Sequence, residues 1–133
     1  MLLGFSHYIY SSCDRAEDAS RVTIAGGSLT EIVYLLGQEN KLVAVDITSN
    51  YPKEAKELPS IGYVRALSAE GVLSLSPTLI LGEDDTGPAA VMEQLSRVGI
   101  QIEIIPEENT TNGIIGKVKC CLLYTSPSPR DLA

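Results

Sequence analysis

Along this chain, short apolar or alternating runs typical of strands take turns with segments in which apolar side chains recur at helical spacing. Each change of spacing marks the boundary of a predicted strand or helix. Residues 21–25 are rich in β-branched side chains, and residues 41–46 form a near-continuous apolar run of the kind found in strands covered on both faces. Residues 78–82 are again short and apolar, and residues 100–105 alternate apolar with polar side chains. The pattern therefore predicts four strands.

Between these strands the apolar side chains recur at helical spacing. Residues 29–36 and 89–98 each carry one apolar stripe, a shorter helix follows Ser68, and a last helix begins within residues 109–119. Residues 53–57 predict a helical turn. The order is β-α-β-loop-α-β-α-β-α, which is typical of an α/β fold with a Rossmann-like parallel sheet and flanking helices.

Three of the predicted helices begin with recognisable capping signals. Ser28 and Glu31 have the spacing of a capping box, in which each side chain satisfies an amide of the first turn. Ser68 is a good N-cap, and Glu70 in the turn that follows gains from the positive end of the helix. Pro88 fits the first helical position, because its missing amide hydrogen would have no partner there.

The carboxyl ends of the predicted strands indicate where a ligand would bind. In open parallel α/β sheets, ligands bind in the crevice outside these ends, where the connecting loops meet. We therefore expect the binding residues on the loops that leave the carboxyl edge of the sheet. In this chain they are residues 26–28, 48–51, 61–65 and 83–87.

Residues 58–70 interrupt the regular alternation of strands and helices. Pro59 and Gly62 exclude a helix at this place. In an extended segment, residues two apart point the same way, so Tyr63 and Arg65 are predicted to face one pocket together. The alternative is a linker with a buried tyrosine and a solvated arginine, and the residues alone leave both interpretations open.

Composition excludes several classes of partner. A chain of 133 residues that is 44% hydrophobic has room for one domain with a packed core. The net charge of −7 and the pI near 4.6 argue against nucleic acid, which requires a basic patch, and against anionic lipid. No apolar run approaches the roughly 18 residues of a membrane span.

The side chains that often bind metals have no recognisable spacing in this sequence. Cys13, Cys120 and Cys121 form neither a zinc motif nor a CxxC motif, and we interpret all three as incidental. The single histidine, His7, completes no metal motif with them. The acidic residues 83–85 follow one another along a loop, so we interpret them as solvated surface.

Both ends of the chain depart from the α/β pattern and leave residues 20–119 as the domain. Residues 1–19 are interpreted as a degraded signal peptide or an extension, since no basic residue precedes the apolar start. The run from Cys121 to Asp131 matches, codon by codon in one frame, the translation of a transposase-type sequencing adapter. We therefore predict that the natural sequence ends near Lys119 and that residues 120–133 derive from the adapter; the alternative is a disordered Ser/Pro tail.

Three motifs carry a resemblance to a known family. They are Gly-Gly-Ser-Leu-Thr-Glu-Ile-Val at residues 26–33, Asp-Ile-Thr-Ser with Tyr-Pro at residues 46–52, and Gly-Tyr-Val-Arg followed by Leu-Ser-Ala-Glu-Gly at residues 62–71. With them, residues 20–119 resemble the periplasmic substrate-binding proteins of haem ABC importers. The resemblance implies a protein with two α/β lobes joined by one long helix, of which this chain would be the N-terminal lobe, and a binding role rather than an enzymatic one.

The same resemblance implies roles for individual residues. In the haem-binding members, the tyrosine of the Gly-Tyr-x-Arg run ligates ferric haem iron, so Tyr63 is the candidate axial ligand and Arg65 the donor to its phenolate. By their position in the turn at residues 26–28, rather than by the resemblance, Gly27 and Ser28 would line the haem pocket, with backbone amides facing a propionate. Glu70 would dock onto an arginine of the membrane permease, although a carboxylate satisfied by the helix dipole explains it equally well. The resemblance further implies a periplasmic location, an ABC transporter permease as partner, and a monomer.

Other functions remain open at this point. Cobalamin or a ferric siderophore binds to the same fold, but neither requires a protein tyrosinate. A nucleotide-dependent enzyme on a Rossmann-like sheet is a rival from another class. Against it, residues 26–31 lack the G-x-G-x-x-G spacing, and the only histidine lies outside the domain, so no nucleophile–base pair is visible. A further alternative is that half of a two-lobed protein has no function alone.

Overall fold

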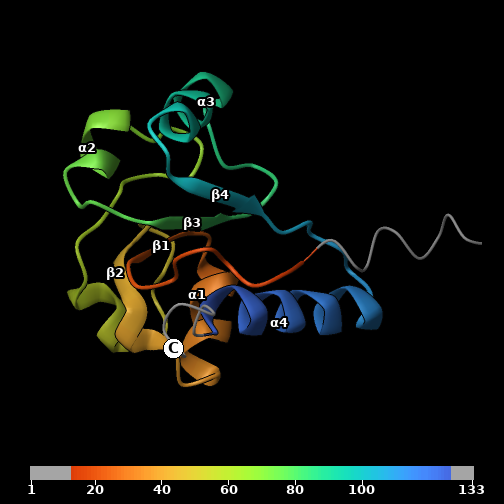
Figure 1. Ribbon diagram of the computed structural model, residues 1–133. Helices are drawn as coiled ribbons and strands as arrows, with labels where there is room; N and C mark the ends of the chain where they lie inside the picture. Colours follow the sequence, from red (N-terminus) through yellow and green to blue (C-terminus); the bar gives the residue numbers. More distant parts are fainter. Residues whose placement is uncertain (1–12, 127–133) are drawn as a thin grey trace, which may run out of the picture.

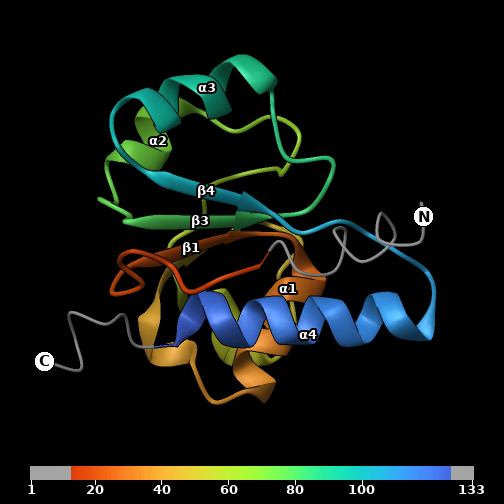
Figure 2. The ribbon, with the colours of Figure 1, turned by 45° about the vertical axis from the view of Figure 1, so that its right-hand side comes forward.

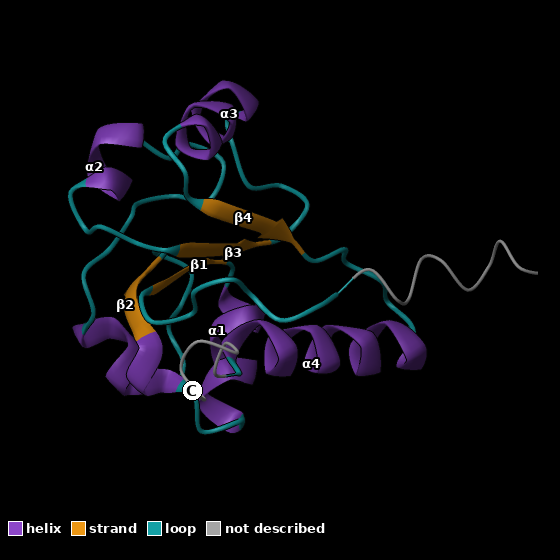
Figure 3. Ribbon diagram, in the orientation of Figure 1, coloured by secondary structure: helices purple, strands orange, loops and turns teal. Residues whose placement is uncertain are grey.

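A four-stranded parallel sheet forms the centre of the computed structural model, which describes residues 13–126. The strands are β1 (Val22–Ala25), β2 (Leu42–Val45), β3 (Leu79–Gly82) and β4 (Gln101–Ile104), in the spatial order β2-β1-β3-β4 (Figures 1 and 3). All three neighbouring pairs are parallel. The predicted Rossmann-like α/β architecture is confirmed, with each strand slightly shorter than its apolar run.

Helices cover both faces of this sheet, so the fold has three layers. One face carries α1 (Gly27–Leu35) and α4 (Thr111–Thr125), which pack against each other, and the opposite face carries α2 (Ala69–Leu73) and α3 (Ala89–Arg97) (Figures 1 and 2). A 3₁₀ helix at Lys53–Glu57 confirms the predicted helical turn. Right-handed crossovers of this kind place helices on both sides of a parallel sheet.

Each face of the sheet has its own hydrophobic core, because neighbouring side chains of a strand point to opposite faces. Val22 and Ile24 of β1 pack under α1 and α4, whereas Ala25 faces α2 and α3. The first core also contains Leu29, Val33, Leu42, Val45, Leu79, Leu81 and Tyr124, and the second contains Ala44, Ile61, Val64, Leu67, Val72, Ile80 and Leu95.

The helix starts agree only in part with the capping signals. The Ser68 hydroxyl accepts a hydrogen bond from the Gly71 amide (3.3 Å), as predicted for an N-cap. Helix α1 begins at Gly27, with Gly26 at its N-cap and no side-chain cap, so the predicted capping box does not form. Pro88 lies at the N-cap of α3, one position before the predicted place.

Helix α4 is longer than the sequence pattern indicated. It continues through Thr125, and Cys120, Cys121 and Tyr124 are buried against the sheet with the rest of the first core. Residues 120–126 therefore belong to the folded structure of this chain. Their derivation from an adapter stays a prediction, and residues 127–133 lie outside the described part.

A disulfide bond corrects the interpretation of the cysteines as incidental. Cys13 and Cys120 are bonded across 107 residues of sequence, which fixes the N-terminal segment onto α4. A crosslink that closes a loop of this length stabilises a fold by about 4–5 kcal/mol in the chain-entropy account. Cys121 is free and buried.

Residues 13–126 contain no helix with the length and apolar character needed to cross a membrane. Within the same residues, no group of three or more His, Cys, Asp or Glu side chains is placed to hold a metal ion. The interpretation of residues 1–19 as a degraded signal peptide or an extension stays a prediction. Residues 1–12 lie outside the described part, and Ala16 and Ala19 are buried in the first core.

Candidate functional site

The strand order makes the carboxyl ends of β1 and β3 the predicted binding edge. From β1 the chain crosses to β2 on one side, and from β2 it returns past β1 to β3 on the other side. The loops after β1 and β3 therefore diverge at their carboxyl ends, which is where parallel α/β sheets bind ligands. Helix α1 begins directly after β1, and residues 83–87 follow β3.

Two glycines bring the start of α1 close to the neighbouring loops. Gly26 has a φ of +143°, and a Cβ placed there would lie 2.6 Å from the Glu83 side chain. A Cβ on Gly27 would lie 2.7 Å from the carbonyl oxygen of Thr48. The buried Asp46 carboxylate accepts hydrogen bonds from the amides of Gly26 (2.9 Å) and Thr48 (3.0 Å). Only glycine allows this close approach of three loops.

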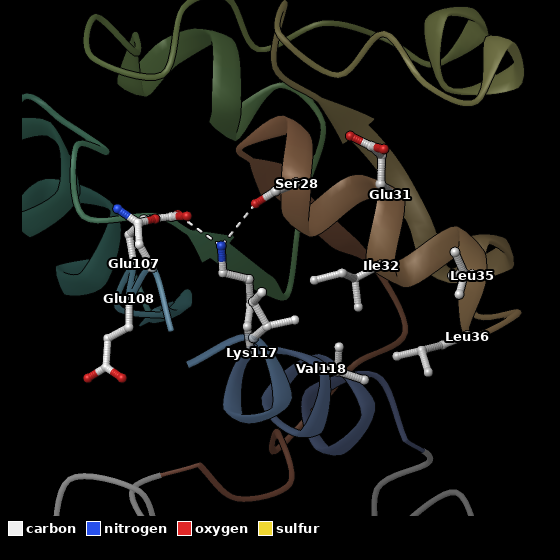
Figure 4. Close-up of a pocket in the computed structure, with 11 residues that line it drawn as sticks. Ser28, Glu31, Ile32, Leu35, Leu36, Glu107, Glu108, Lys117 and Val118 are labelled. Atoms are coloured by element: carbon white, nitrogen blue, oxygen red, sulfur yellow. Dashed lines mark hydrogen bonds and ion pairs between the residues drawn. The ribbon is translucent and has the colours of Figure 1, made fainter. Parts of the chain in front are cut away.

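Ser28 lies at the centre of a polar network. Its hydroxyl donates to Glu83 Oε1 (2.5 Å) and accepts from Lys117 Nζ (3.2 Å), and Lys117 also donates to Glu107 Oε2 (2.9 Å). Figure 4 shows Lys117 reaching from α4 between Ser28 and Glu107. The Lys117 side chain is 8% exposed and that of Glu107 is 45% exposed. The network thus joins α1, α4 and the loops after β3 and β4.

A pocket of about 600 Å³ opens beside this network, between α1 and α4 (Figure 4). Ser28 and Lys117 lie at one end of it, and Ile32, Leu36 and Val118 supply apolar walls. A smaller hollow of about 390 Å³ lies at the carboxyl edge and is lined by Ser28, Glu83, Asp84, Asp85 and Glu107. Neither hollow is lined by Tyr63 or Arg65 among the described residues.

The segment that leads to Tyr63 extends the sheet. The Val45 amide donates to the Pro59 carbonyl (3.1 Å), and the Ile61 amide donates to the Val45 carbonyl (3.0 Å), so residues 59–61 lie alongside β2. This parallel pairing covers the outer edge of β2 and carries the chain to the carboxyl end of the sheet. Tyr63 follows Gly62, whose carbonyl accepts from the Ile47 amide (3.0 Å), so it lies at the carboxyl edge of the sheet. Its part in binding stays a prediction.

The expected extended conformation of residues 63–65 is wrong. The Ala66 amide donates to the Tyr63 carbonyl (2.9 Å), which closes a β-turn with Val64 and Arg65 in its central positions. Val64 and Leu67 are buried in the core beneath α2 and α3. Burial of these two side chains turns Tyr63 and Arg65 outward, and 45% of Tyr63 is exposed.

Arg65 pairs with the loop after β3 rather than with Tyr63. Its Nε atom lies 3.3 Å from Asp85 Oδ2, and this is its only hydrogen bond to residues 13–126. Asp84 accepts a hydrogen bond from the Glu107 amide (2.9 Å), and Glu83 is bonded to Ser28. The prediction of a solvated surface is confirmed for Asp84 and Asp85, which are exposed, whereas Glu83 is half-buried. The sequence did not indicate that each of the three carboxylates has a defined partner.

The remaining side chains of interest are Glu70, on α2, and Cys121, on α4. Glu70 is exposed in the first turn of α2, and its carboxylate has no hydrogen bond or ion pair within residues 13–126. Cys121 is buried on α4, one helical turn after Lys117. Burial raises the pKa of the Cys121 thiol from 9.0 to about 12, while the neighbouring Lys117 ammonium acts in the opposite direction.

Comparisons with known proteins identify the fold. The profile of a family described as periplasmic binding protein matches residues 22–120. Among solved structures, a periplasmic heme binding protein from Pseudomonas aeruginosa is 42% identical with a TM-score of 0.75, over 77% of this chain and 37% of that chain. The periplasmic heme binding protein HutB of Vibrio cholerae is 39% identical with a TM-score of 0.76, over 81% of this chain and 42% of that chain.

A vitamin B12-binding relative is also similar. The vitamin B12-binding protein of Yersinia pestis is 38% identical over 87 residues, which is 65% of this chain and 31% of the relative. The chain thus spans about a third of the curated relatives it matches and corresponds to one lobe of two-lobed proteins. Its family consists of substrate-binding proteins, not enzymes, which removes the rival interpretation as a nucleotide-dependent enzyme. The chain belongs to the periplasmic binding protein family.

Proposed function

We propose that the full-length protein binds haem in the periplasm and delivers it to the permease of an ABC importer. The observation that carries this proposal is the position of Tyr63. Its phenol is exposed at the carboxyl edge, on a turn whose neighbours Val64 and Leu67 are anchored in the core. Similarity to two periplasmic heme binding proteins, at 42% and 39% identity, supports haem as the ligand.

The chemistry of Tyr63 and Arg65 suits ferric haem. A phenolate is a hard anionic ligand for Fe(III), and tyrosine is an established axial ligand of haem iron. Arg65 keeps its positive charge at every physiological pH and carries several donors in one plane. Its terminal nitrogens have no partner within residues 13–126, so they are available to a phenolate or to a ligand carboxylate.

Gly27 and Ser28 contribute through their backbone in this proposal. The Ser28 hydroxyl is occupied by Glu83 and Lys117, so it does not serve as a ligand donor. The amides of Gly27 and Ser28, in the first turn of α1, have no acceptor within the described residues. A haem propionate would find there two donors and the positive end of a helix.

Glu70 is proposed to dock onto an arginine of the permease, and the protein to act as a monomer. The exposed carboxylate lies on α2, on the face of the sheet opposite α1 and α4 (Figure 1). It is free of the polar network at the binding edge. This separation supports a division between ligand binding at Tyr63 and docking at Glu70.

Cobalamin is the second candidate, because a vitamin B12-binding relative reaches 38% identity. A ferric siderophore belongs to the same class of alternatives. Cobalamin carries its own axial ligand to cobalt and needs no tyrosinate. Replacement of the Tyr63 phenol alone therefore separates the haem proposal from these alternatives.

Hemin titration followed by visible absorption tests the proposal, on this chain and on the full-length protein. We expect a saturable spectrum of tyrosinate-ligated ferric haem. Tyr63→Phe should abolish that spectrum and weaken binding by roughly 100-fold or more, since it removes a metal ligand. Tyr34→Phe is the matched control, because it removes a phenol from α1 and should leave the titration unchanged. Equal spectra and affinities in Tyr63→Phe and the parent would refute the assignment, and saturable binding of cyanocobalamin without hemin binding would favour the alternative.

A further inference from the structure

The contact between Arg65 and Asp85 joins two loops of the binding edge. Asp85 meets the guanidinium only at Nε, through a single contact of 3.3 Å. Both side chains are exposed, Arg65 by 65% and Asp85 by 38%. The contact leaves both terminal nitrogens of Arg65, with four N–H donors, free of any partner in residues 13–126.

The backbone around this pair is fixed on both sides. The Gly87 amide donates to the Val64 carbonyl (2.9 Å), and the Leu67 amide donates to the Gly87 carbonyl (2.9 Å). These two bonds attach the turn that carries Arg65 to the loop that carries Asp85. Because the loops are already held together, little conformational freedom is lost when the two side chains meet.

The Asp85 loop is itself closed into a turn. The Thr86 amide and hydroxyl both donate to the Glu83 carbonyl, at 3.0 and 2.7 Å. The neighbouring carboxylates are used elsewhere, since Glu83 bonds Ser28 and Asp84 accepts from the Glu107 amide. Asp85 is thus the acidic side chain of this loop that is directed at Arg65.

We infer that Asp85 is a positioning residue for Arg65. It holds the Nε edge of the guanidinium and so presents the terminal nitrogens to a ligand that is bound through Tyr63. This inference rests on the proposed function, because it takes the Tyr63 phenolate and its ligand as the acceptors. It adds a residue from the loop after β3 that neither the Gly-Tyr-Val-Arg motif nor its spacing contains.

The direction in which hemin affinity changes when Asp85 is replaced distinguishes a positioning role from a purely electrostatic one. If Asp85 acted only through its negative charge, its removal would favour the Tyr63 phenolate and an anionic ligand, and binding would tighten. If Asp85 positions Arg65, its removal frees the guanidinium to adopt many rotamers, and binding weakens. The two roles predict opposite changes in hemin affinity.

Hemin titrations of three variants make this test. We expect Asp85→Asn to raise the dissociation constant roughly tenfold, as is usual for residues that support a metal ligand. Asp85→Glu keeps the charge and the acceptor and should restore most of the affinity. Glu93→Gln is the matched control, because it removes the carboxylate of another exposed arginine pair, with Arg97 on α3. Affinity in Asp85→Asn equal to or above that of the parent would overturn the inference.

A measurement without haem keeps the two proposals apart. The Arg65 Nε–H resonance in a ¹⁵N–¹H spectrum, assigned by its absence in Arg65→Lys, should exchange with water more slowly in the parent than in Asp85→Asn. Thermal unfolding should be the same in both, since an exposed ion pair contributes little to stability. Equal exchange rates would overturn the inference whatever hemin does. A clear difference in exchange, together with no hemin binding by the parent or the full-length protein, would instead overturn the proposed function.

Discussion

At the scale of single residues, the burial of Cys121 predicts slow alkylation of its thiol in the folded chain. The thiol is fully buried, and burial raises its pKa to about 12 from an ordinary value of 9.0. The thiolate is the reactive form, so at pH 8 the folded chain should react with iodoacetamide roughly a thousandfold more slowly than the unfolded chain. Mass spectrometry of the labelled chain, with its disulfide intact, in buffer and in denaturant measures the ratio.

The same shift has a consequence for stability at alkaline pH. Because the folded state keeps its proton up to a higher pH than the unfolded state, the contribution of Cys121 is complete below pH 9 and is lost as the pH rises to about 12. Labelling of Cys121 at equal rates in buffer and in denaturant would contradict both statements. It would mean that the end of α4 is open in solution.

The residue-scale errors of the sequence interpretation have one physical origin. Ser28 and Glu31 had the local pattern of a capping box, but the Ser28 hydroxyl bonds Glu83, which lies 55 residues away in sequence. Cys13 and Cys120 pair across 107 residues. Local spacing carries no information about partners brought together by tertiary folding. The position of Tyr63 at the carboxyl edge follows from topology, whereas its turn follows from the burial of Val64.

At the scale of elements, Lys117 connects α4 to the loops after β3 and β4. Removing either partner of its ion pair with Glu107 should reduce the free energy of unfolding by a different amount. The lysine is buried, and its partner Glu107 is half exposed. Glu107→Ala leaves a buried ammonium with only the Ser28 hydroxyl, which should cost roughly 3 kcal/mol. Lys117→Met leaves a carboxylate that water can reach, so its cost should be smaller, at about 1 kcal/mol.

Urea unfolding of the two variants measures this difference. Both transitions should keep the parent slope, because the surface exposed on unfolding is nearly the same. Glu54→Ala, on the 3₁₀ helix far from α4 in sequence, controls for the loss of an exposed carboxylate. A larger cost for Lys117→Met than for Glu107→Ala would show that the lysine charge is solvated and that the network does not hold α4.

The elements themselves were predictable because their signals are local. All four strands and the helices between them follow from apolar period and from Gly or Pro at the boundaries, as at Gly37 and Gly99, which both have positive φ. The length of α4 was not predictable in the same way. The pattern beyond Lys119 is apolar on several sides, and only the packing of Tyr124 and Cys121 in the core decides that the helix continues.

At the scale of the whole molecule, the proposed binding edge would form one wall of a larger site. The chain covers 37% and 42% of the two heme-binding structures, which have a second lobe. Tyr63, Arg65 and the first turn of α1 all lie at the carboxyl edge, so ligand contacts from a second lobe would face them. This geometry explains why hemin affinity should be compared between this lobe and the full-length protein.

Glu70 tests whether docking and ligand binding are separate properties of the molecule. Glu70→Lys loses a favourable interaction with the start of α2, worth about 0.3–1 kcal/mol, which is too little to unfold the lobe. Within the described residues, Glu70 takes no part in the Arg65–Asp85 contact. In the full-length protein we therefore expect hemin binding to be unchanged and uptake through the permease to fall severalfold. Glu57→Lys, an exposed site with the same charge change, should impair neither. Parallel loss of binding and uptake in Glu70→Lys would show that the carboxylate supports the fold or the site, and unchanged uptake would remove it from the docking surface.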